Sequence, residues 1–97
     1  MVEYKKGYFA TSLAGHDKGR LYIIIEETAK QDGKDYVLLA DGEIKTLDKP
    51  KKKKVKHIQV IHCMDKKIEE LIVSEKPIRD EDIKCAIKTY YREHRRI

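Results

Sequence analysis

The sequence predicts a mainly β fold with helices at its C-terminal end: a small five-stranded barrel, then a short helix and a longer one. Five short runs that favour strands follow each other closely and are separated by tight-turn signals, which is typical of small barrels. From Met64 onward, the apolar residues instead recur with helical spacing. The 97 residues are enough for one domain with one modest core.

The first three strands are predicted from apolar, β-branched and aromatic runs. Residues 7–14 form the first strand, and residues 21–25, the strongest strand signal in the chain, form the second. The turn between them, residues 15–20, has a glycine near each end. A hairpin turn is expected at residues 31–34, and it leads into a third strand at residues 36–40.

The last two strands are predicted on either side of a lysine-rich loop. Asp41-Gly42 is typical of a two-residue type I′ hairpin, so residues 43–47 are expected to pair back across it. Pro50 argues against a strand in the lysine run around it, which is therefore expected to be a loop. Residues 57–62 form the fifth strand. One barrel interior is expected to hold the apolar strand side chains Phe9, Ile23, Ile25, Val37, Leu39, Ile58 and Val60.

Two helices are predicted after the strands. The first begins near Asp65, and Pro77 breaks the chain behind it. The second is expected to have Asp80 as its N-cap, with further acids in the first turn, where the helix dipole favours them. Its apolar stripe comprises Ile83, Ala86, Ile87 and Tyr90. We therefore expect residues 1–62 to form the barrel and residues 63–97 to form a helical extension packed on or beside it.

The positive charge is concentrated in two short stretches. The formal net charge is +5. Residues 49–57 contain six lysines and no acid, and the chain from Lys84 to its C-terminus contains five basic residues and one acid. Clustered positive charge of this kind favours a polyanionic partner, and an ordinary solvated surface is the alternative.

The first turn and its flanking strands resemble a KOW motif. In that family a strand leads into a Gly-x-Asp-Lys-Gly loop and a hydrophobic strand follows. Here Gly15, Asp17, Lys18 and Gly19 stand at the matching positions. The resemblance continues through residues 36–42 and the lysine run, and it covers roughly residues 5–62. The whole stretch is similar to bacterial relatives of the archaeal and eukaryotic large-subunit ribosomal KOW proteins of class fourteen.

One position departs from the usual motif. The family often has a second glycine soon after the Lys-Gly pair, whereas this chain continues with Arg20, Leu21 and Tyr22. This departure makes Tyr22 a candidate either for a contact with the partner or for the core.

The resemblance implies an SH3-like (KOW) barrel that binds RNA, usually within or on a ribosome. Large-subunit ribosomal RNA and ribosomal proteins are the expected partners. The residues expected to contact RNA are His16, Lys18, Arg20, Lys49, Lys51, Lys52, Lys53, Lys54, Lys56 and His57. The C-terminal helix lies outside the matched stretch, and its basic face has two interpretations, a second RNA contact or a solubilising surface. The residues of that second contact are Lys84, Lys88, Tyr91, Arg92 and Arg95. Tyr91 is expected to be exposed, and Tyr90 to be part of the core.

A protein-interaction module is the alternative function. KOW domains also occur in transcription elongation factors, so a polymerase or a ribosomal protein is the alternative partner. SH3-like barrels offer open edge strands to peptides. The lysine run argues against a partner that is purely protein.

Other classes of function have little support in the sequence. The histidines and cysteines lack the ligand spacing of a zinc site, so no metal or other cofactor is expected. No nucleophile–base arrangement is recognisable, so we expect neither an enzyme nor a small-molecule substrate. The N-terminus lacks the apolar segment of a signal peptide, and no apolar run approaches the roughly 20 residues that span a bilayer. A cytoplasmic protein with reduced thiols, and no membrane partner, is therefore expected.

Overall fold

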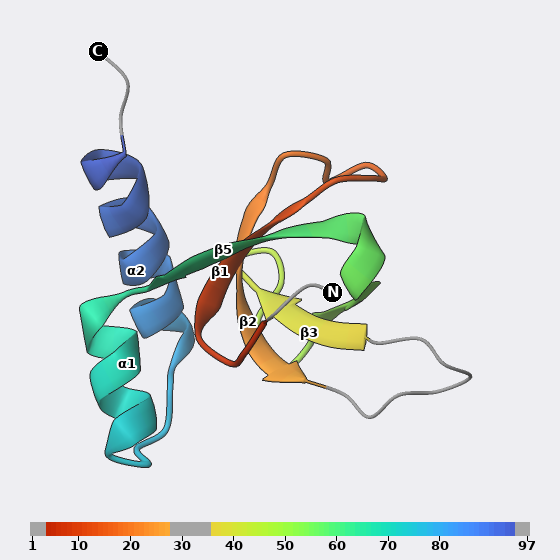
Figure 1. Ribbon diagram of the computed structural model, residues 1–97. Helices are drawn as coiled ribbons and strands as arrows, with labels where there is room; N and C mark the ends of the chain where they lie inside the picture. The colour runs from red at the N-terminus through yellow and green to blue at the C-terminus, as the bar shows by residue number, and fades with distance from the viewer. Residues whose placement is uncertain (1–3, 28–35, 95–97) are drawn as a thin grey trace.

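The computed structural model describes residues 4–27 and 36–94, which form a curled five-stranded antiparallel sheet with two helices (Figure 1). The strand order is β4-β3-β2-β1-β5. The elements are β1 (Tyr8–Ser12), β2 (Leu21–Glu27), β3 (Tyr36–Ala40), β4 (Lys51–Lys54), the one-turn 3₁₀ helix η1 (Val55–His57), β5 (Ile58–Met64), α1 (Lys66–Val73) and α2 (Asp80–Glu93).

The predicted class, mainly β with C-terminal helices, is confirmed, and so is the number of strands. The sheet is not closed into a barrel: within the described residues, the edge strands β4 and β5 do not pair with each other. β1 lies inside the sheet, where Phe9 is opposite Ile23 on β2 and Ile61 on β5. The expected hairpin turn at residues 31–34 lies outside the described residues.

The lysine run forms strand β4, so the prediction of a lysine loop is wrong. β4 pairs with β3 along its whole length, from Leu39 opposite Lys51 to Tyr36 opposite Lys54. Pro50 immediately precedes the strand and therefore removes no hydrogen bond from the ladder.

Residues 43–47, predicted to pair back as a strand, instead form an irregular connection. The physical reason is Asp41, whose Oδ1 accepts hydrogen bonds from the N–H groups of Glu43 at 3.0 Å and Lys45 at 2.9 Å. The chain therefore wraps around this carboxylate instead of making a two-residue hairpin. Gly42 has a φ of +79°, and a Cβ at this position would collide with the carbonyl oxygen of Asp80 on α2. A glycine is thus required where the connection meets the helix.

Apolar residues pack on both faces of the sheet. One group, here called the helix-side core, lies between the sheet and the helices and comprises Phe9, Leu21, Ile23, Ala40, Ile68, Ile83 and Ala86. The other, the strand-side core, comprises Ala10, Tyr22, Ile24, Val37, Leu39, Val55 and Ile58.

The prediction of a single interior is therefore wrong for Phe9, Ile23 and Ile25, which face the helices. Successive strand residues point to opposite faces, so a strand that is covered on both sides is apolar at every position. Residues 21–25 are such a run. Tyr22 is a core residue, buried to 1% exposure.

The two helices begin where the sequence indicates, with one correction. Asp65 caps α1 by accepting hydrogen bonds from the N–H groups of Lys67 and Ile68. Asp80, predicted to be the N-cap of α2, is the first helical residue instead, and Arg79 is the N-cap. The Asp80 carboxylate is occupied elsewhere: it accepts from the Leu47 N–H at 2.9 Å and ties α2 to the β3–β4 connection.

The apolar stripe of α2 packs as predicted. Ile83 and Ala86 are buried, and the ring of Tyr90 lies 4.8 Å from that of Phe9 between centroids. This packing leaves Lys84, Lys88 and Tyr91 exposed. Neither helix in the described part of the chain has the length and apolar character needed to cross a bilayer.

Candidate nucleic-acid interface

The turn between β1 and β2 is organised around Asp17. Its Oδ1 accepts hydrogen bonds from Ser12 Oγ at 2.9 Å and Lys53 Nζ at 2.8 Å, and its Oδ2 accepts from the Tyr22 hydroxyl at 2.8 Å. These four residues are here called the Asp17 network. Lys51 Nζ adds an ion pair at 3.4 Å from Oδ2. Three strands and one turn are thereby joined through one carboxylate.

Lys53 is fully occupied by this network. Its ammonium donates to Ser12 Oγ at 2.6 Å and to the Ala14 carbonyl and Asp17 Oδ1 at 2.8 Å each. The side chain is only 9% exposed. Because an ammonium has three protons, none remains for a phosphate. Lys53, which the sequence suggests as an RNA contact, is therefore a structural residue here.

The alternation of side chains along β4 explains why the four lysines differ. Val37 and Leu39 are buried in the strand-side core, and they stand opposite Lys53 and Lys51. These two lysines therefore share the inward face and reach Asp17. Lys52 and Lys54 occupy the outward face. A run of four identical residues gives no periodic signal, so the sequence could not separate the two pairs.

The network also shifts the pKa values of Asp17 and Tyr22. Burial alone would raise the pKa of Asp17, but hydrogen bonds from Lys53, Tyr22 and Ser12 outweigh it and hold the pKa well below its usual range. Burial and the hydrogen bond to Asp17 raise the pKa of the Tyr22 phenol well above its usual range.

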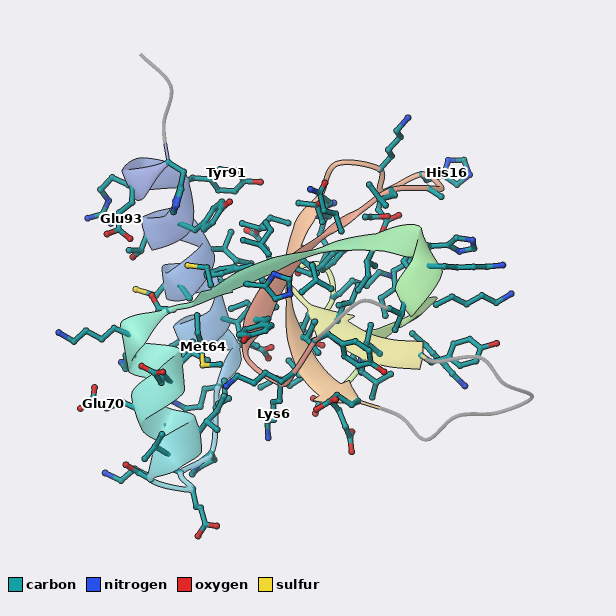
Figure 2. All side chains as sticks on the ribbon, viewed as in Figure 1. Lys6, His16, Met64, Glu70, Tyr91 and Glu93 are labelled. Atoms are coloured by element: carbon teal, nitrogen blue, oxygen red, sulfur yellow. The ribbon has the colours of Figure 1, made fainter. Side chains whose placement is uncertain are left out.

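The other basic side chains of the β1–β2 turn, β4 and η1 are here called the basic edge. It comprises His16 and Lys18 on the β1–β2 turn, Lys52 and Lys54 on β4, and Lys56 and His57 on η1. The Leu13 N–H donates to the His57 carbonyl at 2.9 Å, which joins the turn to η1. In Figure 2, His16 extends outward at the tip of this turn.

The basic edge carries little compensating negative charge. Asp17 is the one acid in residues 13–20 and 51–57, and Lys53 and Lys51 already neutralise it. Lys18, Lys52 and Lys56 are exposed. The Lys52 ammonium lies 4.6 Å from the centroid of the Tyr36 ring, a cation–π contact that orients the side chain and keeps its charge. Lys49 is also exposed, on the connection before β4.

Arg20 lies apart from this edge and meets the residues predicted on the C-terminal helix. Its Nε forms an ion pair with Asp41 Oδ2 at 3.1 Å. Together they line a cavity of ≈ 270 Å³, here called the helix-side pocket, with Leu21, Glu43, Lys84, Ile87, Lys88 and Tyr91. Sequence reasoning placed Arg20 and the helix residues in two separate sites, and the fold brings them together. Arg92 is exposed outside the pocket, and Arg95 lies outside the described residues.

The histidines and cysteines do not gather into a metal site. Within residues 4–27 and 36–94, no three His, Cys, Asp or Glu side chains come together as metal ligands would. Cys63 and Cys85 are free thiols, and both are exposed.

No protein-family model matches the chain, and no curated protein matches it significantly.

Proposed function

We propose that the chain is a non-enzymatic RNA-binding module that docks on folded RNA through its basic edge. The observation that carries this proposal is the set of exposed cations from three segments, beside a single acid that is already neutralised within the fold. A surface of this kind attracts a polyanion such as the RNA backbone.

The types of side chain indicate how the RNA is held. Lysine is a point charge that contacts phosphate oxygens and carries no information about the base sequence. Folded and double-stranded RNA is recognised largely by its shape and its backbone. The basic edge is therefore suited to a structured RNA. The KOW resemblance supports large-subunit ribosomal RNA as that target, in a cytoplasmic role in translation.

The affinity of the native protein for a structured RNA is expected to depend steeply on salt. If the four lysines of the basic edge each neutralise one phosphate, raising salt from 50 to 200 mM weakens binding by about 50- to 150-fold. Fluorescence anisotropy with a labelled ribosomal RNA helix measures this directly. An affinity that stays constant across the titration would contradict phosphate-mediated binding. Association with a partner that survives both nuclease and high salt would instead favour an apolar protein contact.

A further inference from the structure

We propose that the helix-side pocket holds one unpaired nucleotide of the same RNA. Its base lies against Tyr91, and the adjoining phosphate lies at Lys84 and Lys88. This proposal rests on the proposed function. It adds the recognition of an unpaired base to the backbone contacts of the basic edge.

The pocket is formed by three elements that the fold fixes relative to each other: the start of β2, the β3–β4 connection and α2. Lys84, Lys88 and Tyr91 are spaced by four and three residues, so they lie on one stripe of α2. The cavity of ≈ 270 Å³ is slightly smaller than the roughly 300–1,000 Å³ of sites for drug-sized ligands. Its size therefore suits a single base rather than a larger molecule.

Tyr91 is an aromatic platform with restricted freedom. The residue is 56% exposed, so a face of its ring is open to a ligand. The ring packs edge-on against Tyr90, with 6.2 Å between centroids. Tyr90 is itself held by Phe9 and by the stacked ring of His94, 4.8 and 4.1 Å away. A supported, exposed ring next to cations is the arrangement with which proteins stack unpaired bases.

The charges around the pocket favour a nucleotide over a simple anion. Arg20, Lys84 and Lys88 provide the cations. Of the two acids, Asp41 is occupied, because it accepts from Arg20 and from two backbone N–H groups. Glu43 remains as an exposed acceptor in the wall. A nucleotide offers its phosphate to the lysines and the N–H groups of its base to the Glu43 carboxylate. Inorganic phosphate has no such donors, and the Glu43 carboxylate would repel it.

The position of Tyr91 also suits RNA that contacts the basic edge. In Figure 2, Tyr91 extends from α2 on the same side of the molecule as the β1–β2 turn that carries His16, and Lys6 lies at the opposite side. Arg20 closes that turn and lines the pocket. The turn thus has cations of the basic edge at its tip and the pocket at its base, so one RNA can contact both.

The experiment compares two RNAs with three proteins. The RNAs are a blunt duplex and the same duplex with a single-nucleotide bulge. The proteins are the native chain, Tyr91→Ala and Tyr91→Phe, whose ring still stacks. For the bulged RNA, Tyr91→Ala is expected to lose about 5- to 150-fold in affinity, in keeping with the loss of one base–aromatic stack, and Tyr91→Phe to retain native affinity. For the blunt duplex, all three proteins are expected to bind alike.

The outcomes separate this inference from the proposed function. Equal affinity of native protein and Tyr91→Ala for the bulged RNA would overturn the inference while leaving binding through the basic edge intact. An equal loss on both RNAs would also overturn it, because it would show that Tyr91 does not sense the unpaired base. Failure of the native protein to bind either RNA would overturn the proposed function, and this inference with it.

Discussion

Replacing Asp17 with asparagine is expected to lower the free energy of unfolding by about 3 kcal/mol, because the buried Lys53 ammonium loses its counter-charge. The Lys53 and Asp17 side chains are 9% and 10% exposed, so little water reaches the ammonium in place of the lost partner. Asparagine has nearly the same shape, so the change tests charge and not packing. Urea denaturation followed by circular dichroism measures the loss.

Two further variants show whether this loss comes from the ion pair. Asp48→Asn removes an exposed acid and is expected to change stability by less than about 0.5 kcal/mol. The double variant D17N/K53M removes both charges and is expected to be more stable than D17N alone, because no uncompensated charge is left buried. A D17N protein as stable as the D48N protein would show that the network contributes no stability.

The same network gives the native fold a pH dependence with a defined sign. Since folding lowers the pKa of Asp17, its contribution is fully present above the unfolded pKa of about 3.9 and is lost as the pH falls below it. Since folding raises the pKa of Tyr22, that contribution is present below about pH 10 and is lost as the pH rises further. The stability difference between native protein and D17N should therefore shrink between pH 5 and the acid limit.

Reversing the charge of Lys52, Lys54 and Lys56 is expected to abolish RNA binding while the fold remains. Three phosphate contacts account for a factor on the order of a thousand in affinity at 50 mM salt. These side chains lie on the outward face of β4 and on η1, outside the Asp17 network. Anisotropy with the labelled ribosomal RNA helix measures the affinity, and circular dichroism confirms the fold.

The matched control is a second triple variant that changes the net charge by the same amount, at lysines outside the basic edge. Lys6, Lys66 and Lys76 are exposed, and reversing all three should leave RNA affinity within a few-fold of native. An equal loss in both triple variants would mean that total charge, and not the basic edge, determines binding. Reversal of the whole run Lys51–Lys54, which the sequence alone suggests, would be a poor test because it also removes Lys53 from Asp17.

Sequence reasoning succeeded where local pattern and final environment agree. The β-branched run at residues 21–25 became β2, and the stripe containing Ile83 and Ala86 packs on the sheet. Tyr91 is exposed and Tyr90 packs against Phe9, both as their positions on the helix indicated.

It failed where a contact outside the local pattern decides the structure. Asp41-Gly42 has the composition of a tight hairpin, but the Asp41 carboxylate binds Arg20 and the N–H groups of Glu43 and Lys45. Asp80 on α2 also binds the Leu47 N–H, so the chain forms a longer connection. Lysines favour solvent, yet those at positions 51 and 53 are drawn inward by a carboxylate more than 30 residues earlier. Asp17 was visible in the motif, but its role as their counter-charge follows only from the register of β4.

The most direct test of the central claim is ultraviolet crosslinking in cells, followed by sequencing of the RNA bound to the native protein and to the Lys52, Lys54 and Lys56 charge-reversal variant. We predict that the native protein crosslinks to large-subunit ribosomal RNA at a defined structured region, through peptides of the β1–β2 turn, β4 and η1, and that the variant does not. Recovery of no more RNA with the native protein than with the variant would contradict the claim that the basic edge binds RNA.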